Sequence, residues 1–199
     1  MSHAFTTRVA LLSALTLSGW AAPATASAAE EEEPASEASE TPDKKPTGAR
    51  SLFDGKTLKG WVPTNYAGNG GATVADGVIR VALGDGLLNG IKLKDGDKLP
   101  KVDYEVTMKA RRIVGDDFFY CLTFPFKKSH ATFVLGGWGG SVCGISSIDF
   151  MDAMENMTMS VREFEESQWY EVRVVITDHR IQGFVDGERI VNANVKDRN

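Results

Sequence analysis

Short β-prone runs joined by Asp-Gly turns fill residues 51–199, and this pattern limits the fold more than any other feature. Between residues 104 and 111, Tyr, Val, Met and Ala alternate with Glu, Thr, Lys and Arg. A period of two is typical of a strand with one buried and one solvated face. Asp76-Gly77 and Asp186-Gly187 each stand between two β-prone runs and predict tight hairpins.

No stretch of useful length repeats apolar residues every 3.6 positions, so the sequence predicts an all-β domain. Further apolar and aromatic runs at 118–126, 130–136 and 168–177 bring the expected total to roughly ten to twelve short strands. Hairpin returns without an internal repeat favour a two-sheet antiparallel jelly-roll sandwich over a propeller. Pro125 predicts that its strand ends there or lies at a sheet edge.

Composition excludes several classes of protein. The chain has 199 residues, which accommodates one domain better than two. Its net charge of −5 argues against an extended basic surface, so we expect no nucleic-acid partner. Its 2 cysteines are too few for a disulfide-dense scaffold or a multi-cysteine zinc site.

The first 28 residues have the pattern of a secretory signal peptide. Arg8 precedes a short apolar core at Val9–Leu17, and small residues at 24–28 offer cleavage sites. The apolar core is shorter than the about 20 residues that span a bilayer, so we expect no membrane span in the mature protein. The sequence therefore predicts export to the periplasm, the cell surface or the medium.

Residues 29–50 form an acidic segment rich in Glu, Pro, Ala and Ser, without aromatic or branched apolar side chains. Such a segment buries too little surface to offset the entropy of ordering, so we expect a disordered linker. An acidic interaction tail is the alternative. The folded β domain is expected at residues 51–199.

A glycine-rich segment at 136–141 surrounds Trp138. Glycine-rich loops let a backbone approach a ligand, and an indole face stacks on the apolar face of a sugar ring. Trp138 is therefore a candidate substrate-binding residue, although a strand connection with a packed Trp explains the segment equally well. The spacing of a phosphate-binding loop is absent.

Three carboxylates and an amide follow within eight residues, at Asp149, Asp152, Glu155 and Asn156. Neighbouring carboxylates suit general acid–base catalysis, and their oxygens suit a divalent cation. We take the three acids as candidate catalytic residues and Asn156 as a candidate substrate ligand. The alternative is a solvated acidic loop.

Three further side chains are reactive by type. His130 begins a predicted strand and is a candidate substrate-binding residue, although a lone His is more often structural.

Cys121 and Cys143 either form a disulfide, if the protein is exported, or are two small apolar residues. The sequence leaves both alternatives open.

Four segments carry a resemblance to a known family. They are LFDGKTLKGW from residue 52, VADGVIRV, DYEVTMKARR and the long run QWYEVRVVITDHRIQGFVDGERIV. Together they resemble the 3-keto-disaccharide hydrolase domain family across residues 51–199. The resemblance implies a concanavalin-like jelly roll that hydrolyses or eliminates at 3-keto-glycosides. A base and an electrophile, either a hydrogen-bond donor or a metal ion, would serve that chemistry.

The chain also departs from the family pattern. Asp149 matches the final Asp of a central strand, but Pro125 stands where Arg is usual and no Glu precedes Asp149 on its strand. Asp152 and Glu155 are the available substitutes. The resemblance further implies that the chain ends before the family's last strand, which would leave an opening strand near Leu52-Phe53 without a neighbour.

These observations predict an exported, carbohydrate-active hydrolase or lyase. The alternative is a lectin-like module that binds sugar without turnover, and a third hypothesis is a structural envelope protein. No motif identifies a cofactor, and a divalent cation at the acidic loop is the one candidate. Fold by itself does not separate these functions.

Overall fold

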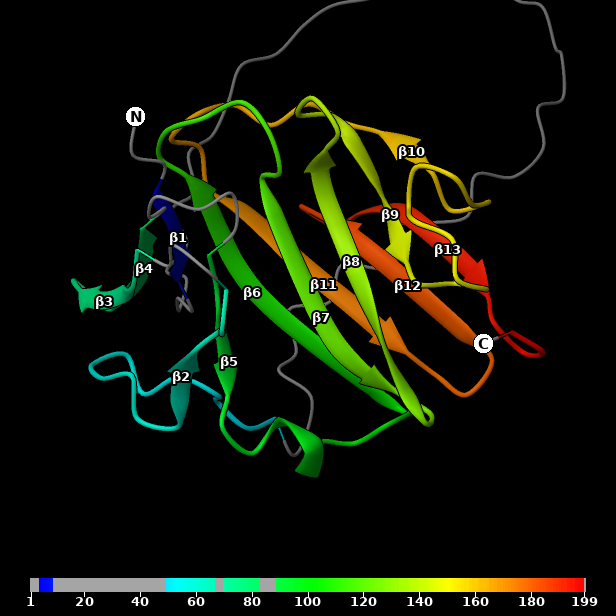
Figure 1. The fold of residues 1–199 in the computed structure, drawn as a ribbon, viewed down its shortest axis with the longest axis horizontal. Coiled ribbons are helices and arrows are strands. Elements are labelled where there is room, and N and C mark those ends of the chain that lie inside the picture. Colours follow the sequence, from blue (N-terminus) through cyan, green and yellow to red (C-terminus); the bar gives the residue numbers. More distant parts are fainter. Residues whose placement is uncertain (1–3, 9–48, 67–69, 83–88, 199) are drawn as a thin grey trace, which may run out of the picture. The chain divides into compact units, whose positions relative to one another are not determined.

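A computed structural model describes residues 4–8, 49–66, 70–82 and 89–198. Within these residues the regular structure is β (Figure 1), apart from one turn of 3₁₀ helix at Gly96–Lys98. The strands are β1 (Ala4–Arg8), β2 (Trp61–Pro63), β3 (Ala72–Ala75), β4 (Val78–Ala82), β5 (Ile91–Leu93), β6 (Tyr104–Arg112), β7 (Tyr120–Phe126), β8 (Ser129–Gly137), β9 (Val142–Ser146), β10 (Ser160–Val161), β11 (Tyr170–Ile176), β12 (Arg180–Val185) and β13 (Glu188–Asn194).

The strands form two main antiparallel sheets and a small ribbon. The larger sheet has seven strands in the order β13-β12-β11-β6-β1-β4-β3, and the smaller has four in the order β10-β9-β8-β7. In Figure 1 the smaller sheet lies across β11, β12 and β13. The ribbon pairs β2 with β5. The predicted all-β, two-sheet jelly-roll sandwich is confirmed, and Pro125 lies on the edge strand β7 as expected.

Two Asp-Gly pairs form the predicted hairpin turns. Asp76 and Gly77 have φ angles of 54° and 71° between β3 and β4, and Asp186 and Gly187 have 51° and 83° between β12 and β13. Positive φ at both central residues defines a type I′ turn, whose twist matches that of the flanking strands. The Asp-Gly pair at each turn therefore accounts for the hairpin, without a contribution from distant residues.

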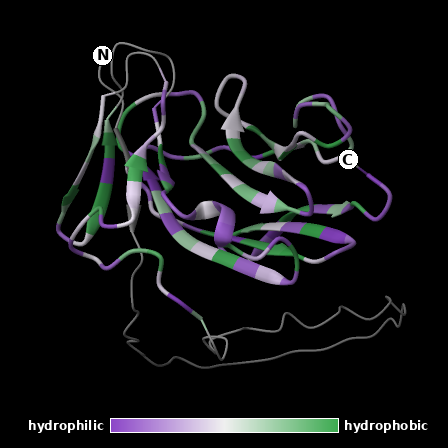
Figure 2. Ribbon diagram, turned by 60° about the horizontal axis from the view of Figure 1, so that its bottom comes forward, coloured by the Kyte–Doolittle hydropathy of each residue, from purple (hydrophilic) through white to green (hydrophobic). Residues whose placement is uncertain are grey.

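The main core lies between the two large sheets. Alternate residues of β6 and β11 face it, which gives the alternating apolar and polar bands along these ribbons in Figure 2. Phe133 of β8 is fully buried and points across the core at Gly183 of β12, where a Cβ atom would lie 2.5 Å from Cζ of the ring. The register of the β12–β13 pair shifts between Gly183 and Phe184. The glycine makes room for the aromatic ring.

A second, smaller core contains Phe53, Ile79 and Val81. The expectation of an opening strand at Leu52-Phe53 is wrong, because residues 51–60 form bends and turns. The side chain of Asp54 organises this segment by accepting hydrogen bonds from the backbone N–H groups of Lys56 and Thr57 and from the Thr57 hydroxyl. The segment is held by a turn motif rather than by strand pairing.

The strand β1 falls within the predicted signal peptide. Its residues 4–8 pair with β4 on one side, and residues 5–8 pair with β6 on the other. The remainder of the predicted signal peptide, and the predicted linker up to residue 48, lie outside the described residues. Signal peptide and linker therefore stay predictions. In the part of the chain that the structure describes, no helix has the length and apolar character needed to cross a membrane.

Cys121 and Cys143 are both free. They lie on β7 and β9, which flank β8 on opposite sides. Strands two positions apart in a sheet are about 9.5 Å apart, whereas disulfide-bonded residues have Cα atoms within about 7 Å. The disulfide left open by the sequence is therefore not formed, and Cys143 is a buried core residue whose burial raises the pKa of its thiol.

Candidate functional site

The connection between β9 and β10, residues 147–159, is a compact loop held against β9. Asn156 is 8% exposed, and its side-chain nitrogen donates to the carbonyl oxygens of Ile145, Met151 and Asp152 at 2.8, 3.3 and 2.9 Å. Thr158 is also buried, and its hydroxyl accepts the N–H of Ile145 at 2.8 Å. Asn156 thus uses its amide to hold the loop together.

The first turn of this loop has an unusual backbone. Asp149 and Phe150 have φ angles of 52° and 64°, and the N–H of Met151 donates to the carbonyl oxygen of Ile148 at 3.0 Å. This is the geometry of a type I′ turn, which favours Asn or Gly at its centre rather than Phe. A bulky residue with positive φ is strained, and such strain concentrates at functional sites.

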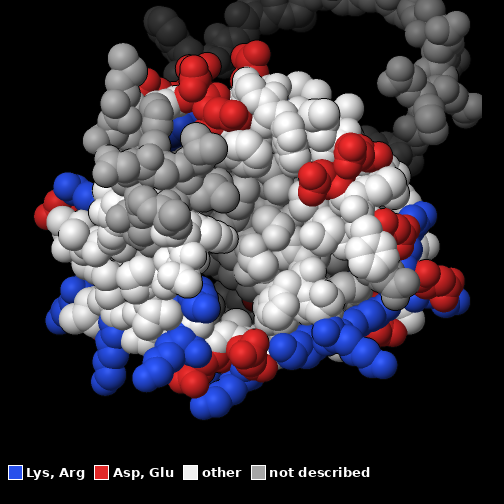
Figure 3. Space-filling view, viewed as in Figure 1, with Lys and Arg blue, Asp and Glu red and all other residues white. Residues whose placement is uncertain are grey.

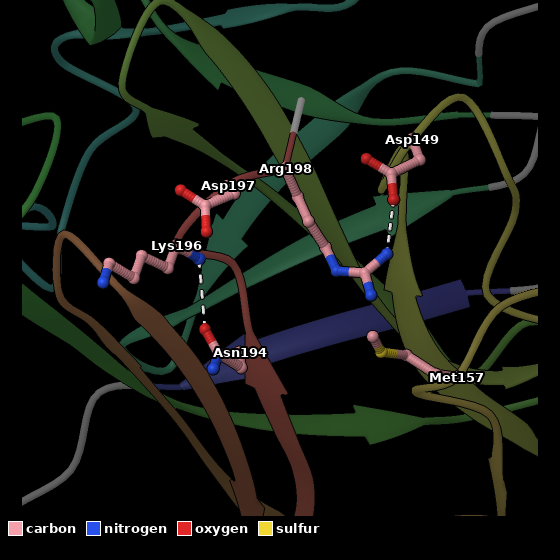
Figure 4. A pocket seen from close by; sticks show the side chains of 6 residues that line it. All are labelled: Asp149, Met157, Asn194, Lys196, Asp197 and Arg198. Carbon is pink, nitrogen blue, oxygen red and sulfur yellow. Dashed lines mark hydrogen bonds and ion pairs between the residues drawn. The ribbon is translucent and has the colours of Figure 1, made fainter.

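Asp149 lines a shallow pocket of about 330 Å³ between this loop and the segment that follows β13 (Figure 4). Its carboxylate accepts a hydrogen bond from the guanidinium of Arg198 in a close ion pair. Both side chains are about one-third exposed, so solvent and small solutes reach them. The residues lining the pocket are Asp149, Met157, Asn194, Lys196, Asp197 and Arg198.

The pocket combines two carboxylates, those of Asp149 and Asp197, with two cationic side chains and an amide. Figure 4 shows Arg198 reaching across to Asp149, while Lys196 extends away from them on the other side. The backbone N–H of Lys196 donates to the side chain of Asn194 at 3.1 Å, which orders the start of this segment. A carboxylate can accept a proton and neighbouring cations can stabilise a developing oxyanion, so the groups suit acid–base chemistry on a polar ligand.

Asp152 and Glu155 lie elsewhere on the loop. Both are exposed, and neither lines the pocket. Among the described residues, no group of three His, Cys, Asp or Glu side chains is arranged to hold a metal ion. The three acids therefore do not converge, and Asp149 differs from the other two in its surroundings.

His130 and Trp138 lie at opposite ends of the nine-residue strand β8, with Trp138 just beyond its last residue. At about 3.3 Å per residue the two positions are some 26 Å apart. Because Thr132 pairs with Ser146, the loop that begins at residue 147 starts at the His130 end. Trp138 is therefore too distant to share a small sugar site with His130.

The glycine-rich segment is a packed strand connection. The Trp138 ring lies 5.2 Å from that of Phe118, and the Asp117 carboxylate accepts the N–H of Gly139 at 3.0 Å. A Cβ atom at Gly140 would lie 2.2 Å from the carbonyl oxygen of Asp116. Gly140 is therefore needed for the close packing of two connections, which supports the structural interpretation of this segment.

No sequence pattern predicted the pocket residues around the end of β13. Asn194 is the last residue of β13, Lys196 and Arg198 follow it, and none of the three matches a motif. They reach the site because β13 packs beside β9 across the sandwich. Lys and Arg are common surface residues, so nothing in the neighbouring sequence indicates that Lys196 and Arg198 line a pocket.

Comparison with known proteins identifies the family. The family model described as the 3-keto-alpha-glucoside-1,2-lyase-like domain matches residues 48–199. No curated protein and no solved structure matches the chain. The matched segment contains the sandwich from β2 to β13 and the whole pocket around Asp149. The chain belongs to the 3-keto-alpha-glucoside-1,2-lyase-like domain family, as the resemblance of its β domain predicts.

Proposed function

We propose that this protein is an exported lyase or hydrolase that acts on 3-keto-glycosides in the pocket around Asp149. One observation carries the proposal: in a member of this family, a carboxylate and the guanidinium of Arg198 meet in a solvent-accessible pocket. Export rests on the signal-peptide pattern of residues 1–28.

The proposed reaction begins with proton abstraction. A ketone at C3 of the sugar acidifies the hydrogen at C2, and the Asp149 carboxylate takes this proton. The electron pair of the C2–H bond moves toward the C3 oxygen and forms an enolate. The enolate then expels the C1 oxygen, so the C1–O bond breaks, a C1–C2 double bond forms and the leaving alcohol takes up a proton. Addition of water to the product completes hydrolysis.

Arg198 has two roles in this proposal. Its guanidinium offers N–H donors to the enolate oxygen, where negative charge develops, whereas Lys196 extends away from the Asp149–Arg198 pair (Figure 4). Arg198 also orients the Asp149 carboxylate through their ion pair. The substrate must take over part of the hydrogen bonding of Arg198 before Asp149 acts, because the guanidinium occupies one of the carboxylate oxygens.

The test measures turnover of a panel of 3-keto-α-glucosides, and the unoxidised glucosides serve as substrate controls. Product is detected by the absorbance of the enone and by release of the leaving group. Asp149→Asn keeps the size of the side chain and removes the base, so we expect turnover to fall by about 10²-fold or more. Asp152→Asn is the matched control on the same loop, because Asp152 does not line the pocket. Equal losses in both variants, or full activity of Asp149→Asn, would refute the assignment of the base.

A sugar-binding module without catalysis is the second candidate. It is favoured by Pro125, which occupies the place of the family's usual Arg, and by the absence of a Glu from β9, the strand that precedes Asp149. This candidate predicts saturable binding of a glycoside that Asp149→Asn weakens, with no product formed from any glycoside in the panel.

A further inference from the structure

We propose that the loop between β9 and β10 is a docking surface for a cationic amphipathic segment of another protein. We call it the methionine surface, and it consists of Phe150, Met151, Met154, Met157, Met159 and Val161. This proposal does not rest on the reaction proposed above, although Met157 also lines the pocket around Asp149.

Apolar side chains gather on this loop to an unusual degree. Among the described residues, eight large hydrophobic side chains are exposed, and six of them belong to the methionine surface. Phe150 is 95% exposed and Val161 is 68% exposed. Clustered exposed apolar side chains mark interaction sites, whereas isolated ones are ordinary.

The loop presents these side chains on a rigid support. Its inward residues are Ala153, Asn156 and Thr158, which are buried. Close packing holds them, since a Cβ atom at Gly144 of β9 would lie 3.0 Å from both the Ala153 Cβ and the Thr158 hydroxyl oxygen. The methionines between these anchors must therefore point outward, and their flexible thioether side chains suit an irregular apolar partner.

Phe150 supplies a second, independent indication. Its φ angle of 64° is costly for an aromatic residue, and its exposure leaves the ring without packing partners that would offset the cost. Exposure and strain at one residue indicate that the ring acts in an interaction outside this chain.

The charges on the loop identify the chemistry of the partner. No Lys or Arg occurs between residues 129 and 161. The charge of Asp149 is paired with Arg198, which leaves Asp152 and Glu155 as exposed carboxylates between the methionines. In Figure 3 the upper right of the molecule, where β9 and β10 lie in Figure 1, is mainly white with red groups between. A complementary partner therefore carries apolar and cationic side chains together, as one face of a basic amphipathic segment does.

Other occupants fit the surface less well. A symmetric contact with a second copy would bury Asp152 and Glu155 of both copies in one interface, which gathers like charge there. The chain's own acidic segment at 30–33 would add like charge in the same way. An anionic membrane repels the two carboxylates.

The experiment uses a short helical Leu/Lys peptide as the probe, with a Leu/Glu peptide of the same pattern and a scrambled Leu/Lys peptide as probe controls. Binding to the full chain is measured by calorimetry at several salt concentrations. We expect the Leu/Lys peptide to bind, more weakly as salt rises, and the two control peptides to bind at least about tenfold more weakly.

Protein variants then assign the binding to the loop. Replacing Met151, Met154 and Met159 with Gln removes apolar contact, and Asp152→Asn with Glu155→Gln removes the charges; each set is expected to weaken binding about tenfold or more. Replacement of the same methionines with Leu keeps the apolar surface and should preserve binding. Glu165→Gln with Glu166→Gln neutralises two exposed carboxylates outside the loop and should also preserve it.

Three outcomes would overturn the proposal. The first is no binding of the Leu/Lys peptide, and the second is equal binding of the scrambled peptide. The third is equal loss of affinity in the loop variants and in the Glu165/Glu166 control, which would indicate attraction to the net negative charge of the whole chain. Circular dichroism of each variant shows that the fold is retained.

Discussion

Asp149, on the loop after β9, and Arg198, beyond β13, form an ion pair across 49 residues of sequence. The pair joins the two segments that line the pocket. Because each side chain is about one-third exposed, solvent screens their attraction, and exposed pairs contribute about 0–1 kcal/mol to stability. We therefore expect the pair to matter for the geometry of the site more than for folding.

Arg198→Gln tests this relationship. The free energy of unfolding of the variant, measured in urea, should lie within about 1 kcal/mol of that of the unmodified protein, because solvent screens the pair. Its turnover of 3-keto-glycosides should fall clearly, because Asp149 loses its orienting partner and the pocket loses a cation. Arg198→Lys should recover part of the activity. Unchanged turnover in Arg198→Gln would exclude a role for the pair in catalysis.

Asn156→Ala should loosen the loop at residues 147–159. The buried amide donates to three backbone carbonyl groups, each of which keeps another donor, and its oxygen accepts the buried N–H of Thr158, which the variant leaves without that acceptor. We expect the free energy of unfolding to fall by about 1–3 kcal/mol, measured by urea denaturation. Glu155→Ala, at the exposed neighbouring position, should change it by less than about 0.5 kcal/mol. A similar effect of both substitutions would mean that the amide does not hold the loop.

Gly183→Ala should destabilise the main core. The added methyl group would lie 2.5 Å from Cζ of the buried Phe133 ring, so the ring or the strand must shift. Overpacking of this kind costs about 1–3 kcal/mol, which thermal or urea unfolding measures. Gly96→Ala is the control, because its new methyl group meets nothing closer than 3.9 Å. The double variant with Gly183→Ala and Phe133→Leu should lose less free energy of unfolding than the two single variants lose together, because the smaller Leu side chain makes room for the new methyl group.

The stability of the protein at low pH should depend on Asp54. Hydrogen bonds from Thr57, first from its hydroxyl and then from its N–H, lower the pKa of this carboxyl from 3.8 to about 2. A lowered folded-state pKa gives stability that is complete above the unfolded-state value, near 4, and is lost as pH falls toward 2. Asp54→Asn should therefore flatten the dependence of stability on pH in that window.

Two measurements check the role of Asp54. Urea unfolding between about pH 2 and pH 5 gives the dependence of stability on pH for both proteins. Nuclear magnetic resonance titration of the Asp54 carboxyl gives its pKa directly. A pKa of Asp54 near the ordinary aspartate value would show that the hydrogen bonds at Thr57 and Lys56 do not form in solution.

The sequence predicted the parts of the site whose residues are close together along the chain, and no others. Asp149, Asp152, Glu155 and Asn156 do share one loop, as their spacing implies. Their different surroundings could not be predicted, because burial depends on which residues fall opposite β9. Asn156 faces inward and binds backbone carbonyl groups, while Asp152 and Glu155 face solvent.

By itself the sequence determined the all-β architecture, its Asp-Gly hairpins and the family to which the chain belongs. These properties depend on alternation along a strand and on backbone preferences within a few residues, which a linear sequence displays directly. Only the tertiary structure decided that Arg198 meets Asp149 and that Trp138 lies at the other end of β8 from His130. Such relationships arise when strands distant in sequence pack across a sandwich, and residue types alone do not specify which side chains that packing brings together.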